Sequence, residues 1–134
     1  MENKELLPMV QLAMQKVNVI PFSGNKIAFG TNTKAVDLST DETLIAEAYL
    51  NTVEEKQTVH LGFTCVLSSA VSSSFQIEVD GSKRPRIFTN TNSTINFTDL
   101  LILAPGLHHI AVNGKTDGSM VTVSPREAKL GVYL

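Results

Sequence analysis

The sequence of 134 residues contains no tryptophan, a single cysteine and few charged side chains. Because Cys65 has no second cysteine to pair with, a framework of intramolecular disulfides is excluded as the support of the fold. Charged residues make up 18% of the chain, and 11 basic residues stand against 13 acidic ones. This balance argues against a nucleic-acid-binding protein, whose affinity depends on contacts between basic side chains and phosphates.

Long apolar runs are also missing. The longest charge-free stretch, residues 57–77, has the length of a membrane span but contains five serines, two threonines and a histidine. These side chains are too polar for a hydrocarbon core. The N-terminus lacks the unbroken apolar stretch and small-residue cleavage site of a secretory signal peptide. We therefore expect no signal peptide, no membrane insertion and synthesis in a cytoplasm.

Residue patterns that carry catalysis or bind metals are absent as well. His108 and His109 are neighbours in a predicted strand, so their side chains point to opposite faces and cannot hold one ion together. Cys65 falls on the apolar face of its predicted strand, where a thiol is buried and unreactive. The sequence has no Gly-x-Ser-x-Gly motif, and no two carboxylates are predicted to face each other across a cleft. We predict that the protein is not an enzyme and uses no metal or cofactor.

Short extended segments separated by turn signals fill residues 18–134. The turn signals recur roughly every eight to twelve residues, a spacing typical of β-sandwiches and barrels. They include Asp80-Gly81, Pro105-Gly106 and Asn113-Gly114. Asp-Gly between two alternating segments is a strong signal for a tight hairpin, because glycine accepts the positive φ that the turn requires.

Hydrophobic and polar residues alternate most clearly in residues 58–67, as expected of an antiparallel strand with one buried face. No helix of useful length separates the predicted strands, so parallel βαβ units are excluded. The pattern predicts a mainly β protein, namely one antiparallel β-sandwich of jelly-roll type with about eight or nine strands. The single domain extends over residues 1–134.

The one helical pattern lies at the N-terminus, over residues 3–17. One stripe at helical spacing is formed by Leu6, Val10, either Ala13 or Met14, and Val17. Such a short helix is expected to cover an edge or a face of the sheets. The alternative is that the stripe docks on another protein, with Val10 and Met14 among the contact residues.

A single basic cluster surrounds Pro85 and consists of Lys83, Arg84 and Arg86. Proline within a strand pattern indicates an edge strand, because it has no backbone N–H to donate to a neighbour. Charged side chains and proline also prevent an edge from pairing with another sheet. The alternative interpretation is that Arg84 and Arg86 contact a partner protein.

The last third of the chain resembles a recurrent ending of bacteriophage tail and receptor-binding sandwich domains. In residues 103–112 a Pro-Gly turn leads into a His-x-Ile-x-Val strand, and residues 126–134 begin at an arginine and end in alternating aliphatic side chains. A helix before a compact sandwich is likewise similar to the shoulder domains of receptor-binding proteins of siphophages with Gram-positive hosts.

This resemblance implies a non-enzymatic structural or accessory protein of the tail or baseplate, which acts through contacts with other phage proteins. It would be located in the tail region of the virion, or in the host cytoplasm during assembly. The chain departs from complete receptor-binding proteins because it has no collagen-like or coiled-coil neck and no separate head domain. Its oligomeric state therefore stays open between a monomer and a homo-oligomer such as a trimer.

A second reading is a host-surface adhesin or a carbohydrate-binding module, since β-sandwiches often have this function. The polar loops at residues 90–94 and 115–119 offer hydrogen bonds to sugars. The absence of tryptophan and the presence of only two tyrosines, Tyr49 and Tyr133, count against an aromatic sugar platform. Both loops also have an ordinary explanation as solvated turns.

Overall fold

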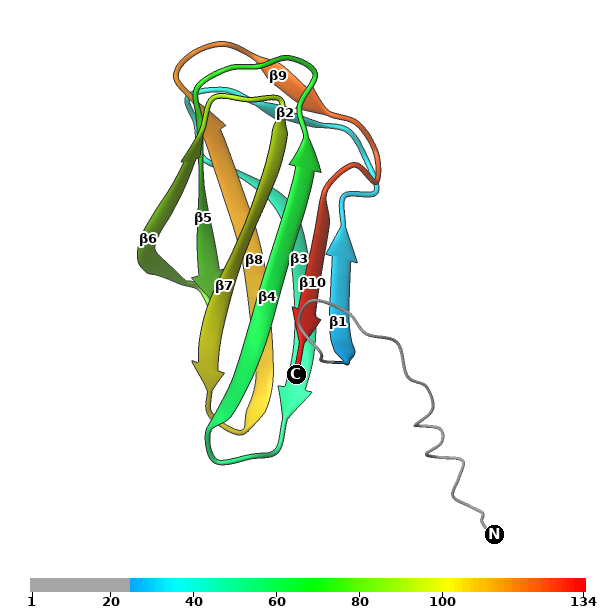
Figure 1. The fold of residues 1–134 in the computed structure, drawn as a ribbon, viewed down its shortest axis with the longest axis vertical. Coiled ribbons are helices and arrows are strands. Elements are labelled where there is room, and N and C mark those ends of the chain that lie inside the picture. Colours follow the sequence, from blue (N-terminus) through cyan, green and yellow to red (C-terminus); the bar gives the residue numbers. More distant parts are fainter. Residues whose placement is uncertain (1–24) are drawn as a thin grey trace, which may run out of the picture.

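The computed structural model describes residues 25–134, which form ten β-strands (Figure 1). In chain order the strands are β1 (Lys26–Thr31), β2 (Val36–Leu38), β3 (Thr43–Thr52), β4 (Gln57–Val66), β5 (Ser73–Val79), β6 (Ser82–Asn90), β7 (Thr94–Leu103), β8 (Gly106–Thr116), β9 (Val121–Val123) and β10 (Lys129–Tyr133). The predicted helix at residues 3–17, with Val10 and Met14, lies outside the described residues. Residues 25–134 include no helix with the length and apolar character needed to cross a membrane.

The strands pair like one long hairpin folded back on itself. Each strand pairs with the strand at the same distance from the β5–β6 turn: β5 with β6, β4 with β7, β3 with β8, β2 with β9 and β1 with β10. Two further antiparallel pairings, β5 with β8 and β4 with β10, join these hairpins sideways. The result is two four-stranded sheets with the orders β1-β10-β4-β7 and β3-β8-β5-β6.

These two sheets form a jelly roll, as the sequence predicts. Their eight strands agree with the expected number, and the two additional strands, β2 and β9, are three-residue segments that form a small sheet of their own. In Figure 1 this small sheet lies at one end of the sandwich, where it covers the ends of the longer strands.

The core lies between the two sheets and follows from the alternation in the strands. In β4, Val59, Leu61, Phe63 and Cys65 all have 0% exposure, whereas the residues between them are partly or fully exposed. The Phe63 ring lies 6.2 Å from the ring of Phe75 in the other sheet, so the two sheets are in direct contact. Burial raises the pKa of the Cys65 thiol to about 12, consistent with a core residue.

The β5–β6 turn has the predicted geometry. Asp80 and Gly81, its two central residues, have φ angles of 53° and 85°. Positive φ at both central positions matches the right-handed twist of a two-stranded hairpin, and Asp-Gly is a favoured pair for such a turn. The Pro105-Gly106 turn between β7 and β8 was also predicted correctly.

The predicted turn at Asn113-Gly114 is wrong, because both residues lie inside β8. The glycine is required by packing. A Cβ atom at position 114 would lie 2.6 Å from Cδ1 of Ile45 and 2.9 Å from the ring of Phe75, so only glycine leaves room for these core side chains. Asn113 is consequently held in the middle of a sheet, with its side chain on the outer face.

Candidate binding pocket

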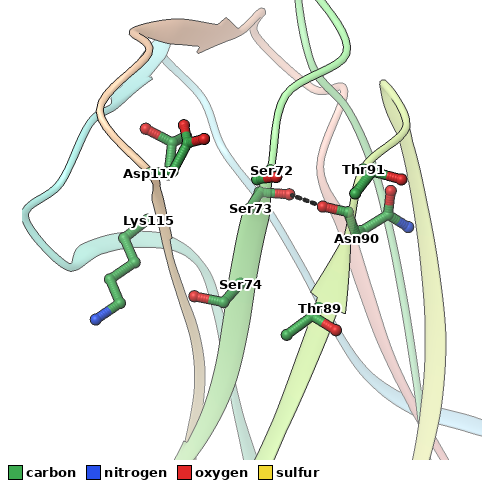
Figure 2. Close-up of a pocket in the computed structure, with 9 residues that line it drawn as sticks. Ser72, Ser73, Ser74, Thr89, Asn90, Thr91, Lys115 and Asp117 are labelled. Carbon is green, nitrogen blue, oxygen red and sulfur yellow. Dashed lines mark hydrogen bonds between the residues drawn. The ribbon is translucent and has the colours of Figure 1, made fainter.

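A pocket of about 600 Å³ opens at one end of the sheet β3-β8-β5-β6 (Figure 2). Three strands end or begin beside it: β5 begins at Ser73, β6 ends at Asn90 and β8 ends at Thr116. The strand register brings these residues together, because Ser73 is paired with Asn90 on one side and with Thr116 on the other. The segments that follow these strand ends are rich in serine, threonine and asparagine, so the pocket is polar.

All nine lining residues are polar: Ser72, Ser73, Ser74, Thr89, Asn90, Thr91, Lys115, Thr116 and Asp117. Six of them carry a hydroxyl group and one an amide. The remaining two, Lys115 and Asp117, contribute one positive and one negative charge. The pocket wall therefore has no net charge and contains no aromatic ring.

Two buried side chains stabilise the backbone of the pocket. Ser73 and Thr116 are each 6% exposed. Ser73 Oγ donates to the backbone oxygen of Asn90 at 3.4 Å, and Thr116 Oγ1 donates to the backbone oxygen of Ser119 at 2.6 Å. Asp117 N also donates to the backbone oxygen of Ser72 at 3.1 Å. The first bond joins β5 to β6, the second lies within the loop after β8, and the third ties that loop to the residue before β5.

Five other lining side chains have polar groups that are available to a ligand. Ser72, Ser74, Thr89, Thr91 and Lys115 make no side-chain hydrogen bond or ion pair with any residue that the structure describes. A hydroxyl group both donates and accepts hydrogen bonds, whereas a lysine ammonium only donates. The pocket thus offers several donors and acceptors along its wall.

The pocket brings together both polar loops that the sequence suggested for sugar contacts. Asn90 and Thr91 belong to the first loop, and residues 115–117 belong to the second. Residues 72–74, which supply a third of the lining, were not among the loops suggested for sugar contacts. Their contribution follows from the pairing of β5 with both β6 and β8, a long-range register that local patterns do not encode.

The pocket contains few titratable side chains. Asp117 is the one carboxylate among the lining residues, and none of them is a histidine or a cysteine. Within residues 25–134, no group of three or more histidine, cysteine, aspartate or glutamate side chains is placed to hold a metal ion.

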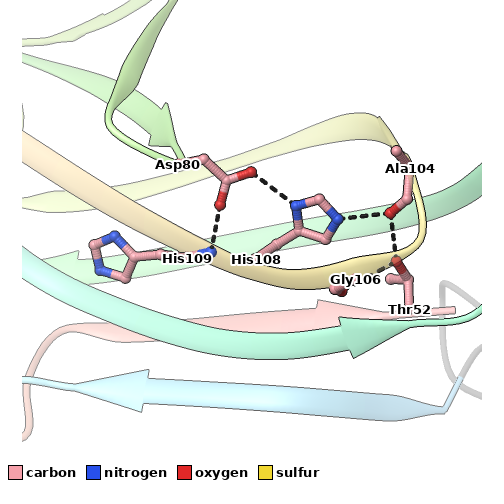
Figure 3. A network of polar contacts seen from close by, with 6 residues as sticks. All are labelled: Thr52, Asp80, Ala104, Gly106, His108 and His109. Atoms are coloured by element: carbon pink, nitrogen blue, oxygen red, sulfur yellow. Dashed lines mark hydrogen bonds and ion pairs between the residues drawn. The ribbon is translucent and has the colours of Figure 1, made fainter.

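The opposite end of the same sheet contains a network of polar contacts (Figure 3). Asp80, in the β5–β6 turn, contacts His108 Nδ1 through Oδ2 at 2.7 Å and accepts from the backbone N–H of His109 through Oδ1 at 2.8 Å. His108 Nε2 lies 2.6 Å from the backbone oxygen of Ala104, which also accepts from Thr52 Oγ1 at 2.6 Å. The network links the β5–β6 turn, the β7–β8 turn and the end of β3.

Protonation of His108 fits this network. Both ring nitrogens face oxygen acceptors, and only the imidazolium form has a proton on each nitrogen. The hydrogen bond to Asp80, followed by the contact with the Ala104 oxygen, raises the pKa of His108 above its ordinary value. The pKa of Asp80 is lowered, chiefly by the same bond to His108 and then by the backbone N–H of His109.

The two arginines proposed as partner contacts lie on β6, which is an edge strand as Pro85 predicted. Arg84 Nε lies 3.4 Å from Asp99 Oδ2 on β7, so this ion pair links the edge strands of the two sheets. The Arg86 guanidinium lies 4.6 Å above the ring of Phe88. Both side chains therefore have contacts within the domain, and their binding to a partner stays a prediction.

No protein-family model matches the sequence, and neither does any curated protein. Among solved structures, the C-terminal domain of EclA, described as a sugar-binding protein, is similar with a TM-score of 0.50 and 9% identity. The match covers 87% of this chain and 84% of that domain. At this identity the similarity shows the fold alone, a β-sandwich.

Two further solved structures are similar, with TM-scores below 0.50. A family 35 carbohydrate binding module from Clostridium thermocellum has a TM-score of 0.47 and 11% identity over 79% of this chain and 97% of the module. The CBM36-1 domain of a xylanase from the hindgut metagenome of Trinervitermes trinervoides has a TM-score of 0.49 and 10% identity over 81% and 96%. None of these three structures is described as a phage protein, so the resemblance to phage tail domains stays a prediction.

Proposed function

We propose that this domain binds a neutral carbohydrate in the pocket formed by β5, β6 and β8. One observation carries the proposal: hydroxyl and ammonium groups of Ser72, Ser74, Thr89, Thr91 and Lys115 line one hollow without hydrogen bonds to the rest of the described domain. A ligand covered with hydroxyl groups supplies both the donors and the acceptors that this wall can pair with.

Two further observations support the proposal. A similar β-sandwich, the EclA C-terminal domain, is described as a sugar-binding protein. In addition, the pocket has one lining carboxylate, whereas glycoside hydrolysis ordinarily requires two carboxyl groups on either side of the scissile bond. Both favour binding over catalysis.

The affinity is expected to be low. No aromatic ring lines the pocket, so binding depends on hydrogen bonds between groups that water also solvates. Each such bond contributes only about 0.5–1.5 kcal/mol net. A few bonds of this kind correspond to a Kd of about 1 mM.

The proposal is tested by titrating the ¹⁵N-labelled full chain with glucose, galactose, xylose and N-acetylglucosamine and recording amide chemical shifts. We expect shifts at residues 72–74, 89–91 and 115–117. Thr89→Val removes one lining hydroxyl and should weaken binding about fivefold, the equivalent of about 1 kcal/mol. Thr98→Val is the matched control, because Thr98 is an exposed strand residue on the outer face of the other sheet.

Absence of shifts with every sugar, at concentrations well above the expected Kd, would contradict the proposal. Equal weakening by Thr89→Val and Thr98→Val would also contradict it, since the pocket would then not be the binding site.

A further inference from the structure

A second hollow of about 300 Å³ adjoins the pocket on the outer face of the sheet β3-β8-β5-β6. The two share Ser74 and Lys115 as lining residues, so they form one continuous polar groove. The floor of the second hollow includes Gln76 and Asn113 from the paired strands β5 and β8. We call this second hollow the Asn113 cleft.

An ion pair spans the Asn113 cleft. Lys83 Nζ at the start of β6 lies 2.6 Å from Glu42 Oε1 in the segment before β3. These residues come from the two edges of the four-stranded sheet, with β8 and β5 between them. The pair holds the loop before β3 against the face of the sheet, and the charges of the lining balance, with Asp41 and Glu42 against Lys83 and Lys115.

Asn113 is the unusual residue in this cleft. It is 9% exposed and is one of five buried polar residues, with Asn32, Thr52, Ser73 and Thr116. The other four make side-chain hydrogen bonds within the domain, to Ser124, Ala104, Asn90 and Ser119 among others. The amide of Asn113 makes none with the residues that the structure describes.

The side chain of Asn113 is directed into the cleft by the strand geometry. Its neighbours Val112 and Gly114 face the core, so the side chain of Asn113 lies on the outer face, where it lines the cleft. The side-chain oxygen and nitrogen of Asn113 are not among the enclosed polar atoms without a partner in residues 25–134, so they are reached from the cleft. A group bound in the cleft can therefore pair with this amide.

We infer that Asn113 forms a second sugar subsite and that the ligand is a neutral oligosaccharide of two or more units lying along β8. This inference rests on the proposed function. Asn113 and Lys115 are two residues apart on one face of β8, a separation of about 7 Å, so a ligand of more than one sugar unit can contact both side chains. An amide presents two donors and an acceptor, which suits a pair of adjacent hydroxyl groups.

The experiment compares ligand lengths. β-1,4-linked series of glucose, xylose and N-acetylglucosamine, from one unit to four, are titrated into the ¹⁵N-labelled full chain. We expect the affinity to rise about tenfold from one unit to two or three, and the side-chain NH₂ signals of Asn113 to shift only with the longer sugars. Asn113→Ala should lower the affinity for the longer sugars to that for a single unit, and leave the latter unchanged.

The outcomes separate the two proposals. If single sugars bind at the pocket but longer ones bind no more tightly and Asn113→Ala has no effect, the inference fails and the proposed function stands. If sugars of no length shift any signal, both fail. Because the signals of Asn113 are observed in the unmodified protein, the test does not depend on how well the variant folds.

Discussion

The two ends of the sheet β3-β8-β5-β6 have similar polar residues but use them differently. At the end where β8 begins, Asp80 bonds to His108, and both His108 and Thr52 bond to the backbone oxygen of Ala104 in the β7–β8 turn (Figure 3). At the end where β8 finishes, hydroxyl groups such as those of Ser74 and Thr89 line a hollow without partners among the described residues (Figure 2).

The difference in hydrogen bonding between the two ends suggests different roles: the paired polar side chains stabilise the fold, and the unpaired ones are available for binding. Polar groups that pair with each other stabilise the turns and have no free donor or acceptor for a ligand. Polar groups without partners contribute little to the stability of the folded state but can form hydrogen bonds with a ligand. A folded protein usually departs from complete hydrogen bonding at its functional sites. Substitutions at the first end should therefore change stability, and substitutions at the second should change binding.

The largest effect is expected from Asp80→Ala. The variant loses the bonds to His108 and to the backbone N–H of His109, and it places alanine at a φ of 53°. We expect a loss of about 2–3 kcal/mol of unfolding free energy, because two bonds to a partly exposed charged group are removed and the turn is strained. Urea unfolding measures this loss, and sugar affinity should be unchanged.

Asp80→Asn is the control for backbone strain. Asparagine also tolerates positive φ and retains an oxygen acceptor for the His109 N–H. Asp80→Asn should therefore lose about half as much unfolding free energy as Asp80→Ala. Equal losses for the two variants would contradict the role given to the turn geometry.

Thr52→Val should lower the free energy of unfolding by less, about 1–2 kcal/mol. Thr52 is 5% exposed, and its hydroxyl donates to the Ala104 oxygen at 2.6 Å. Valine has nearly the same shape and fits a strand, so the lost stability reports on this hydrogen bond. Thermal unfolding should show a Tm lowered by about 4 °C per kcal/mol. An unchanged Tm would mean that the bond does not contribute.

The same network predicts a pH dependence of stability. The pKa of folded His108 is raised from 6.5, so its contribution is complete below pH 6.5 and disappears as the pH rises through the folded-state value. The pKa of folded Asp80 is lowered from 3.8, so its contribution is present above pH 3.8 and disappears as the pH falls through the folded-state value. The pair therefore stabilises the domain most between pH 3.8 and 6.5.

Unfolding at pH 5.5 and at pH 8.5 tests this dependence. The unmodified protein should lose more stability than His108→Gln over this interval, because glutamine does not titrate. Identical losses in both proteins would assign the pH dependence to other groups.

The sequence predicted those features that depend on local patterns. The alternation around Phe63 identified the core face of β4, and Asp80-Gly81 identified a tight turn, because the side-chain period and the turn chemistry are local properties. The β-sandwich followed from the number and spacing of such segments. Pro85 marked an edge strand for the same reason, since the missing N–H is a property of one residue.

Features that depend on long-range register were not predictable in this way. Asp80 and His108 are 28 positions apart and meet only because β5 pairs with β8. Asn113-Gly114 was interpreted as a turn, because glycine permits a turn and also permits close packing. Phe75, which requires that glycine, lies on a different strand. The two polar loops were identified, but they meet in one pocket only because β5 pairs with both β6 and β8.

Asn113→Val should leave stability unchanged or raise it by up to about 1 kcal/mol. It removes an amide that makes no side-chain hydrogen bond within residues 25–134 and places a β-branched residue inside a strand. The same change should abolish the gain in affinity for longer sugars. Urea unfolding and the length-series titration measure the two effects. A large loss of stability would mean that the amide supports the fold.

The smallest change in stability is expected from Thr89→Val, within about 0.5 kcal/mol of the unmodified protein, because an exposed hydroxyl without a partner is removed. Chemically it is the same substitution as Thr52→Val, made at the opposite end of the sheet. Thr52→Val should lower stability without affecting sugar binding, and Thr89→Val should weaken sugar binding without affecting stability. If both variants lower stability equally, the hydroxyl of Thr89 contributes to the fold, and the contrast between the two ends does not hold.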